Sequence, residues 1–377
     1  MTKVMTVVGT RPEIIRLSEV IKRLDATVDH VLVHTGQNYD YELNEIFFEE
    51  LGLRKPDHFL EVDTSSLGRV LGEVLIKTEK VLLQEKPDAF LVLGDTNSCI
   101  AAVMAKRMRI PVYHMEAGNR CFDENVPEET NRRMIDHVAD FNLVYTEHAR
   151  RNLLAEGIHP RRILLTGSPM NEVLAAQRSA IDTSDVLGRL GLKEGDYFLV
   201  SAHREENVDN PARLSTLLDC LEAVVEEYEL PVLVSTHPRT RSRLETAGRE
   251  VAGVRFHKPL GFHDYNHLQL KARCVLSDSG TIAEESSLLG FPAITLRDSI
   301  ERPEALDTGS IIMTGLDPVG VVEAIRSKAH AFAHGPGSTP PDDYSIANTS
   351  QRAVDFVLST WRRHPAWSGL RPLGAVR

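Results

Sequence analysis

Short apolar segments alternate with longer amphipathic segments along most of the chain. Continuous apolar runs separated by helical patterns are typical of parallel strands that are buried on both faces. The pattern predicts six strands in each half of the chain: residues 4–8, 30–34, 89–93, 112–115, 142–145 and 163–165, then 198–201, 232–235, 254–257, 274–276, 293–296 and 311–313. The clearest helical patterns between them cover residues 67–84, 213–227 and 319–332.

This order of elements predicts an α/β protein with two Rossmann-like, doubly wound domains rather than one very large sheet. We expect the boundary near Gly167-Ser168-Pro169, which gives an N-terminal domain over residues 1–168 and a C-terminal domain over 169–344. A Pro- and Gly-rich stretch at 335–341 then leads to a helical pattern from Ser345 to Arg362. We expect the tail, residues 345–377, to pack back on the first domain.

The composition narrows the classes of function. The chain has 377 residues, of which 42% are hydrophobic and 26% charged, as in ordinary globular proteins. Its formal net charge of −11 argues against a general nucleic-acid binder, because binding to a polyanion requires a cationic surface. That charge describes the whole surface, however, so a small phosphate pocket remains compatible with it.

Cysteine spacing and hydropathy point to the compartment. The four cysteines, Cys99, Cys121, Cys220 and Cys274, form no CxxC motif, which excludes the common zinc and dithiol patterns. The first apolar run is too short for a signal peptide, and no apolar stretch reaches the roughly 18 residues of a membrane span. We therefore expect a soluble, cytoplasmic protein that binds neither membrane nor nucleic acid.

Polar residues gather directly after the predicted strands. In doubly wound sheets, ligands bind beyond the carboxyl ends of the strands. A single His or Asp at such a position is usually a helix cap or a loop hydrogen bond. Six such loops together predict a ligand-binding cleft between two sheets. They are Gly9-Thr10-Arg11, Gly94-Asp95-Thr96, His114-Met115-Glu116, Ala202-His203-Arg204, Thr236-His237 and Asp278-Ser279-Gly280.

Two of these turns, at Gly9-Thr10-Arg11 and at Ser279-Gly280-Thr281, suit a diphosphate. Ser279-Gly280-Thr281 opens a helix, where free backbone N–H groups and the helix dipole attract an anion, and Glu285 one turn later could hold a ribose. An ordinary helix cap explains this turn equally well. Arg11, Arg16 and Arg302 are candidate phosphate ligands, although isolated arginines are usually solvated surface residues. The absence of GxGxxG and P-loop motifs makes NAD and ATP less favoured ligands.

Three carboxylates, Asp95, Glu116 and Glu128, are suited to proton transfer at carbon, because crowding and burial raise a carboxyl pKa toward neutrality. They could also ligate a metal together with His114. We find no convincing third ligand beside His263 and His267, so no metal site is expected. No GxSxG motif supports a serine hydrolase.

Together, these motifs resemble those of the non-hydrolysing UDP-N-acetylglucosamine 2-epimerases over essentially the whole chain. The resemblance is carried by residues 9–13 (GTRPE), 35–37 (TGQ), 94–96 (GDT), 116–118 (EAG), 127–132 (PEETNR), 203–207 (HREEN), 278–280 (DSG) and 297–304 (RDSIERPE). It implies two Rossmann-like domains facing a cleft, as in glycosyltransferase-B folds, and a homodimer that binds a UDP-sugar without cofactor or metal. It also implies elimination of UDP across C1–C2 to a glycal, followed by re-addition after protonation of the opposite face.

By motif position, the resemblance implies a catalytic group of Asp95, Glu116, Glu128 and His203. We assign proton transfer and cation stabilisation to the carboxylates, and the leaving diphosphate to His203. The residues assigned to the UDP-sugar are Arg11, Arg16, Arg132, Arg204, His237, Ser279, Gly280, Thr281, Glu285 and Arg302.

Several departures from the family pattern keep alternatives open. Arg16 replaces a common Lys, Glu205 replaces the second Arg of HRREN, Thr281 replaces a Gly, and residues 37–42 read QNYDYE where relatives carry QHR. That last region helps to bind an activating UDP-sugar in bacterial relatives, so substrate activation is not expected here. Residues 9–18 (GTRPEIIRLS) and 35–45 (TGQNYDYELNE) also resemble a branch that acts on 6-deoxy-L-sugars, UDP-N-acetyl-L-fucosamine and its talose epimer. The further alternatives are a hydrolysing epimerase that releases free N-acetylmannosamine, a glycosyltransferase and a non-enzymatic UDP-sugar-binding regulator.

Overall fold

The computed structural model describes residues 1–36, 45–236, 238–249, 251–335 and 337–371. The chain forms two compact units. The first unit consists of Met1–Asn119, Pro127–Val173 and Ile346–Arg377, and the second of Arg120–Val126 and Leu174–Ser345. The chain therefore enters the second unit briefly at Arg120–Val126, and it crosses again inside helix α7 (Met170–Asp182), a few residues after the position expected from the sequence.

The first unit contains a parallel sheet of seven strands in the order β3-β2-β1-β4-β5-β6-β7. The strands are β1 (Lys3–Val8), β2 (Asp29–His34), β3 (His58–Phe59), β4 (Ala89–Leu93), β5 (Val112–Met115), β6 (Phe141–Val144) and β7 (Ile163–Leu165). All six strands predicted for this half of the chain are present. The edge strand β3 was missed, because it has two residues and pairs only with Val33 and His34.

The second unit contains a parallel sheet of six strands in the order β10-β9-β8-β11-β12-β13. They are β8 (Phe198–Ser201), β9 (Val232–Ser235), β10 (Val254–His257), β11 (Cys274–Ser277), β12 (Ala293–Thr295) and β13 (Ile311–Met313). In each sheet the strand order reverses once, at β1 and β4 in the first and at β8 and β11 in the second. The predicted α/β class with two doubly wound sheets is confirmed.

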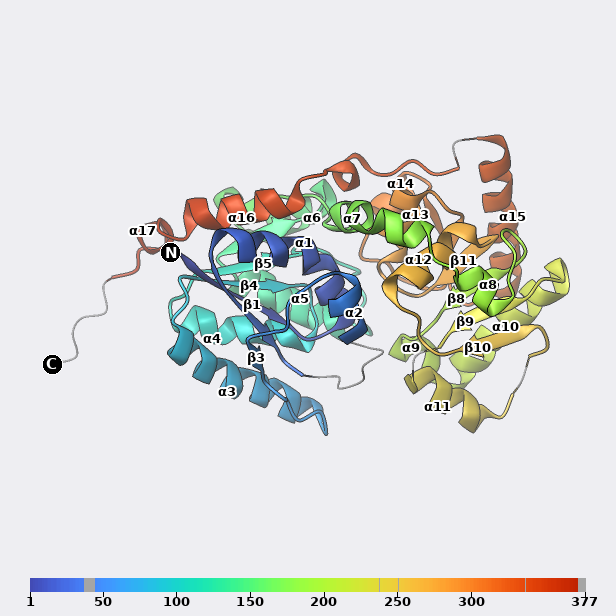
Figure 1. Cartoon of the computed structure of the whole chain (residues 1–377), viewed down its shortest axis with the longest axis horizontal. Coiled ribbons are helices and arrows are strands. Elements are labelled where there is room, and N and C mark those ends of the chain that lie inside the picture. Colours follow the sequence, from blue (N-terminus) through green and yellow to red (C-terminus); the bar gives the residue numbers. More distant parts are fainter. Residues whose placement is uncertain (37–44, 237, 250, 336, 372–377) are drawn as a thin grey trace. The chain divides into compact units, whose positions relative to one another are not determined.

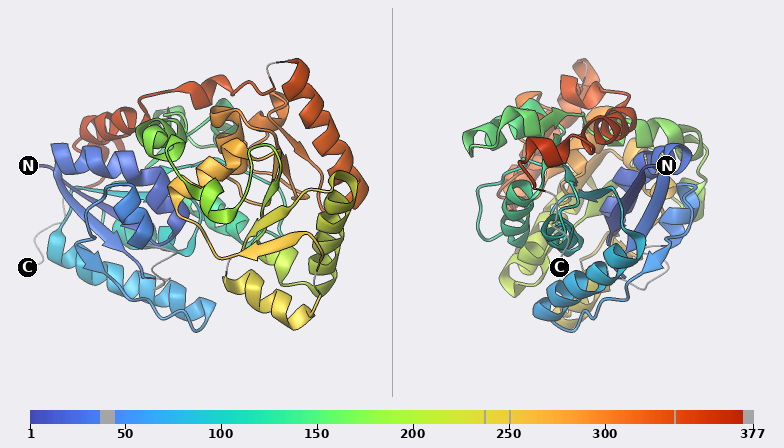
Figure 2. Two further views of the ribbon diagram at one scale, coloured as in Figure 1. Left: turned by 45° about the vertical axis from the view of Figure 1, so that its right-hand side comes forward. Right: turned by 90° about the vertical axis from the view of Figure 1, so that its left-hand side faces the viewer.

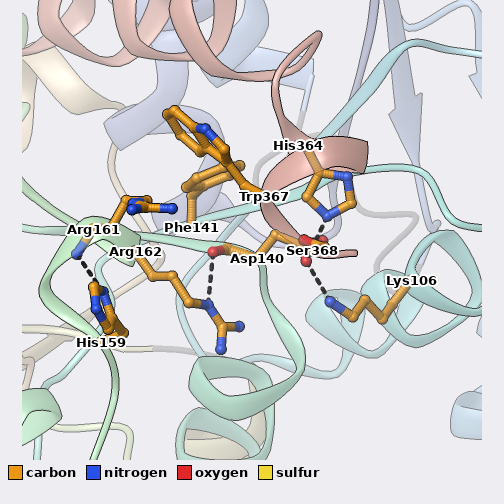
Figure 3. Close-up of a pocket in the computed structure, with 9 residues that line it drawn as sticks. All are labelled: Lys106, Asp140, Phe141, His159, Arg161, Arg162, His364, Trp367 and Ser368. Atoms are coloured by element: carbon orange, nitrogen blue, oxygen red, sulfur yellow. Dashed lines mark hydrogen bonds and ion pairs between the residues drawn. The ribbon is translucent and has the colours of Figure 1, made fainter. Parts of the chain in front are cut away.

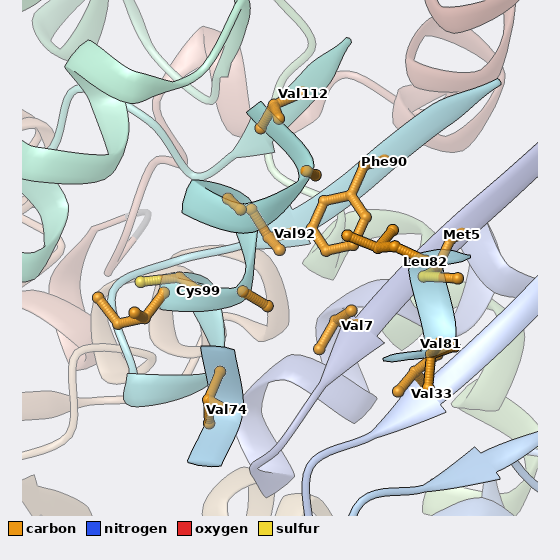
Figure 4. Close-up of a cluster of buried hydrophobic side chains, with 14 of the residues drawn as sticks. Met5, Val7, Val33, Val74, Val81, Leu82, Phe90, Val92, Cys99 and Val112 are labelled. Carbon is orange, nitrogen blue, oxygen red and sulfur yellow. The ribbon is translucent and has the colours of Figure 1, made fainter. Parts of the chain in front are cut away.

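Helices cover both faces of the first sheet, with α1 and α16 on one side and α3 and α4 on the other (Figure 1). The helical elements that begin in this unit are α1 (Arg11–Thr27), α2 (Glu45–Glu50), α3 (Leu67–Glu85), η2 (Asn97–Ile100), α4 (Ala101–Arg107), α5 (Pro127–Val138), α6 (Glu147–Ala155), η3 (Pro160–Arg162), α7, α16 (Thr349–Thr360) and α17 (His364–Trp367). Val74 and Val81 of α3, seven residues apart and so on one face of the helix, pack against Val7 and Phe90 of the strands (Figure 4).

The second sheet is likewise covered on both faces. Its helical elements are α8 (Val186–Leu190), α9 (Glu205–Val208), α10 (Pro211–Tyr228), α11 (Pro238–Ala247), α12 (Phe262–Lys271), α13 (Ile282–Leu289), α14 (Glu304–Asp307), α15 (Pro318–His334) and η4 (Asp342–Ser345). Helices α10 and α15 lie side by side (Figure 2) and pack on Phe198 and Val200, whereas α12 and α13 pack on the alternate residue Leu199. This alternation is what a strand buried on both faces requires. Within the described part of the chain, no helix has the length and apolar content needed to cross a bilayer.

The C-terminal helices return to the first sheet. Helix α16 contacts α1, and the hydroxyl of Tyr113 in β5 lies 2.7 Å from Oγ1 of Thr360. The ring of Phe141 packs edge-on against Phe356 at 5.4 Å between centroids. The Thr349 hydroxyl donates to the carbonyl of Thr166 at 3.0 Å, which fixes the start of α16 beside the end of β7.

A pocket of about 440 Å³ lies at the amino ends of β6 and β7, under α17 (Figure 3). The carboxylate of Asp140 is its only acidic lining group among the described residues. It pairs with Lys106, lies 2.8 Å from Nε2 of His364, and accepts the backbone N–H of Val112 at 3.0 Å. Burial alone would raise the pKa of Asp140, but His364, Lys106 and the Val112 N–H hold that pKa below its usual value.

We predict that Asp140→Asn lowers the free energy of unfolding by about 1–3 kcal/mol, because a buried, charge-assisted contact between the sheet and α17 is lost. The folded pKa lies below the unfolded value of about 3.9, so the stabilisation is present above that pH and is lost as the pH falls through the folded value. Urea unfolding of both proteins between about pH 7 and pH 3 should therefore show their difference shrinking in acid. Asp355→Asn, at an exposed position of α16, is the control; equal losses in the two variants would contradict this account.

Candidate active site

The loops after β1, β4 and β5 meet at the reversal point of the first sheet. These loops and the helices α1 and α5 carry six of the predicted site residues: Arg11, Arg16, Asp95, Glu116, Glu128 and Arg132. Parallel strands place their carboxyl ends along one edge of a sheet, so residues far apart in the sequence lie on the same rim.

Glu116 is the most constrained of these residues. Its carboxylate pairs with Nη1 of Arg16 at 2.5 Å, and both side chains are about nine-tenths buried. Asn119 lies 3.5 Å from its other oxygen. The backbone of Glu116 has φ +63°, a left-handed conformation that costs a non-glycine residue about 1–3 kcal/mol and persists where the surroundings enforce it. Arg16, predicted to contact phosphate, thus lies against a carboxylate.

Asp95 and Arg132 form the second ion pair of this rim. Nε and Nη2 of Arg132 donate to Oδ2 of Asp95 at 2.9 and 2.6 Å, and Nη1 donates to Glu129 at 2.8 Å. Oδ1 of Asp95 has no hydrogen bond within the described chain, and the Asp95 side chain is 24% exposed. Arg132, predicted to bind substrate, therefore fixes the orientation of a candidate acid–base group.

Glu128 and Arg11 complete the first set. Glu128 lies in the first turn of α5 and is half-buried, and no described residue forms an ion pair or hydrogen bond with its carboxylate. The guanidinium of Arg11 lies over the ring of Phe47, 5.6 Å from its centroid. The N–H donors of a guanidinium lie in the plane of the group, so an aromatic ring below that plane does not cover them.

Glu13 is a functional candidate that sequence reasoning missed, although it belongs to the GTRPE motif. Its buried carboxylate accepts the N–H groups of Gly9 and Thr10 at 2.6 and 2.7 Å, and the hydroxyls of Thr96, at 2.8 Å, and Ser98. Burial raises the pKa of Glu13, and these hydrogen bonds offset part of the increase. Glu13 therefore joins the loop after β1 to the loop after β4.

Asp278 has the same role in the second unit. Its fully buried carboxylate accepts the backbone N–H of His203, at 3.1 and 3.0 Å, and that of Arg204, at 3.0 Å. Nδ1 of His203 lies 3.4 Å from Oδ1 of Asp278, and the His203 side chain is one-third exposed. Asp278 thus links the loops after β8 and β11 and orients the imidazole.

Two guanidinium groups converge on the turn formed by Ser279, Gly280 and Thr281. Arg302 pairs with Glu284 at 2.9 Å and donates to the carbonyl of Gly280. A Cβ placed on Gly280 would lie 3.5 Å from Nη1 of Arg302 and 3.9 Å from Nη2 of Arg204. The turn leads directly into α13, so backbone N–H groups and two cations occur together.

The remaining predicted residues are less directly placed. The Ser279 and Thr281 hydroxyls lie 2.9 Å apart. Glu285 is buried, and its carboxylate accepts a hydrogen bond from the side-chain amide of Gln269 at 2.6 Å. This bond orients the carboxylate that we expect to hold the ribose. His237 and residues 37–42 lie outside the described residues.

The structure thus gathers the predicted residues that it describes into two sets. One set, in the first unit, is rich in carboxylates, and the other, in the second unit, combines cations with a helix N-terminus. Among the described residues, no cluster of His, Cys, Asp or Glu side chains is arranged to hold a metal ion. His263 bonds to Gln177 and His267 to the carbonyl of Ile181, so both histidines have structural partners. Doubly wound sheets with polar residues at the reversal points of the strand order are typical of α/β proteins that bind nucleotides or nucleotide-linked ligands.

Comparison with known proteins identifies the family. The profile of the UDP-N-acetylglucosamine 2-epimerases matches residues 22–358. A UDP-N-acetylglucosamine 2-epimerase of Methanocaldococcus jannaschii is 38% identical over 334 residues, covering 86% of this chain and 91% of that protein. This chain therefore belongs to the UDP-N-acetylglucosamine 2-epimerase family.

Solved structures agree with this assignment. The structure of UDP-N-acetylglucosamine 2-epimerase from Rickettsia bellii superposes with a TM-score of 0.91 at 45% identity, covering 98% of this chain and all (100%) of that one. The crystal structure of the M. jannaschii UDP-GlcNAc 2-epimerase in complex with UDP-GlcNAc and UDP gives a TM-score of 0.89 at 34% identity, with 95% and 100% coverage.

We predict that Gly118→Ala destabilises the protein more than Gly157→Ala, by about 1–3 kcal/mol. Both glycines have strongly positive φ, +81° and +85°, but a Cβ on Gly118 would lie 2.4 Å from the carbonyl oxygen of Ala149, whereas one on Gly157 meets nothing within 4 Å. Gly157→Ala therefore serves as the control for backbone strain alone. Urea unfolding curves of the two variants measure the difference, and equal midpoints would show that the contact with Ala149 relaxes at no cost.

Proposed function

We propose that this chain interconverts the C2 epimers of a UDP-N-acetylhexosamine, UDP-N-acetylglucosamine and UDP-N-acetylmannosamine. The observation that carries the proposal is the carboxylate set of Asp95, Glu116 and Glu128 on the rim of the first sheet, in a chain of this family. The M. jannaschii relative solved with UDP-GlcNAc and UDP supports the choice of substrate.

The chemistry explains why carboxylates are needed. The C2 hydrogen of an amino sugar is not adjacent to a carbonyl group, so simple enolisation cannot invert C2. In the proposed reaction a base removes the C2 proton, the C–H electron pair forms a C1=C2 bond, and the C1–O bond breaks, releasing UDP with its electron pair. An acid then protonates C2 from the opposite face as UDP adds back to C1, so that atoms and charge balance over the cycle.

We assign the proton transfers to Asp95, Glu116 and Glu128. Asp95 and Glu116 are each held by an arginine, which fixes their position, and Glu128 is half-buried with a carboxylate that no described residue binds. Two groups on opposite faces of the sugar are required, because the proton leaves one face and arrives on the other.

We assign the departing diphosphate to residues of the second unit, which is then the UDP-binding domain. His203, Arg204, Arg302 and the turn 279–281 offer cations and backbone donors, and such groups stabilise developing negative charge on a leaving group. Asp278 supports this role because it orients both His203 and Arg204. We also assign Arg11 and His237 to binding of the UDP-sugar, and Glu285 to binding of its ribose.

The sugar, the assembly state and the compartment are also part of the proposal. A 6-deoxy-L-sugar is the alternative substrate, because residues 9–18 (GTRPEIIRLS) and 35–45 (TGQNYDYELNE) resemble that branch. We propose a homodimer, from the family resemblance, and a cytoplasmic location, from the cysteine pattern. Sedimentation equilibrium tests the dimer.

Incubation with UDP-N-acetylglucosamine in deuterated water tests the reaction. We expect deuterium at C2 in both epimers and no net accumulation of UDP. Free N-acetylmannosamine with stoichiometric UDP would instead identify a hydrolysing enzyme. Turnover of an acceptor without exchange at C2 would identify a glycosyltransferase. Exchange confined to UDP-N-acetyl-L-fucosamine would assign the 6-deoxy-L-sugar branch.

We predict that Asp95→Asn and Glu116→Gln each lower kcat by about 10²–10⁴-fold, the range for loss of a general acid or base. UDP affinity, measured by calorimetry, should change by less than about threefold, since the diphosphate ligands lie in the second unit. Glu79→Gln, at an exposed position of α3, is the control. Loss of UDP binding in either variant, with kcat at saturation intact, would reverse the assigned roles.

A further inference from the structure

A buried His–Asp pair lies directly behind the carboxylate rim of the first sheet. His114, in β5, and Asp136, in α5, are both fully buried. Nδ1 of His114 lies 2.9 Å from Oδ1 of Asp136, and Nε2 lies 2.8 Å from the carbonyl oxygen of Gly94. The Asp136 carboxylate also accepts the backbone N–H of Gly118, at 3.2 and 3.1 Å.

The hydrogen-bond partners on both sides of the ring fix the orientation of the His114 imidazole. The Gly94 carbonyl can only accept, so Nε2 of His114 carries a proton. A second proton lies between Nδ1 and Asp136, on the imidazole or on the carboxyl group.

The pair connects the segments that carry the candidate acid–base residues. Gly94 directly precedes Asp95, Gly118 follows Glu116 by two residues, and α5 carries both Glu128 and Arg132. The turn at Glu116 needs such support, because its backbone is left-handed and Gly118 is packed against Ala149. One hydrogen-bonded unit thus spans the loop after β4, the loop after β5 and helix α5.

We propose that the His114–Asp136 pair is a positioning device that fixes the carboxylates of Asp95 and Glu116 relative to each other for proton transfer. This inference rests on the proposed epimerase function. It assigns no chemical step to the pair: both side chains are sealed from solvent and act through the two loops. An error of about 1 Å in such a geometry costs roughly a hundredfold in turnover.

The test compares Asp136→Ala with Asp136→Asn. We expect Asp136→Ala to lower kcat by about 30- to 100-fold, with KM and UDP affinity within about threefold of the wild type, as for other groups that orient a reacting residue. Asp136→Asn should recover at least about a tenth of wild-type kcat. Its amide oxygen still accepts from Gly118 and its NH₂ group can donate to Nδ1 of a neutral His114.

Tyr113→Phe is the matched control. Tyr113 is the neighbouring residue of β5 and is equally buried, but its hydroxyl bonds to Thr360 of α16, away from the rim. This variant loses a buried hydrogen bond of the same strand, so we expect a lower unfolding temperature with kcat within about twofold of the wild type.

Each outcome decides the inference. It is overturned if Asp136→Ala keeps kcat near the wild-type value, if Asp136→Asn is no better than Asp136→Ala, or if Tyr113→Phe loses as much kcat for the same drop in unfolding temperature. If Asp136→Ala does not fold, His114→Gln replaces it in the comparison with Asp136→Asn, and the same criteria apply. The glutamine keeps a donor toward the Gly94 carbonyl but loses the contact with Asp136. Wild-type protein without C2 exchange on any UDP-amino sugar would overturn the proposed function itself.

Discussion

Buried carboxylates that accept backbone N–H groups hold the polar rims of both sheets. Glu13, Asp136 and Asp278 are each almost completely buried, and each accepts main-chain donors from the loop that follows a strand. A buried carboxylate costs several kcal/mol unless its oxygens are satisfied, and loops have free N–H groups to satisfy them. Each buried acid therefore stabilises a loop, and the N–H groups of that loop offset the cost of burying the carboxylate. The candidate acid–base residues Asp95 and Glu116 follow these held segments directly and are less completely buried.

The two rims use this device for different purposes. In the first unit, Glu13 and the His114–Asp136 pair tie three loops together, and the outer carboxylates Asp95 and Glu116 are then fixed by arginines. In the second unit, Asp278 holds the backbone beneath His203 and Arg204, so that cations are presented instead. One set is suited to moving protons and the other to receiving negative charge.

The elements of the fold could be predicted from the sequence because buried parallel strands leave an unmistakable apolar pattern. Strand β3 was not predicted, because two residues at the edge of a sheet form no apolar run. The candidate site could be predicted only at the level of loops. Glu13 and Asp278 lie in the GTRPE and DSG motifs, but their burial and their backbone partners, like those of Asp136, appear only when distant strands are brought together. The partners of Arg16 and Arg132 depend on contacts across 100 and 37 residues, which spacing alone does not reveal.

The short excursion of Arg120–Val126 into the second unit bears on how modular the protein is. This segment contains the buried residues Arg120 and Val126, and Asp123 within it accepts a hydrogen bond from Ser299 at 3.2 Å. It also separates Glu116 from Glu128 along the chain. The first unit is therefore not complete as a separate fragment. A fragment ending at Val173 would contain Arg120–Val126 without the residues of the second unit that this segment packs against. The unsupported segment would be the connection between Glu116 and Glu128, two of the candidate acid–base residues.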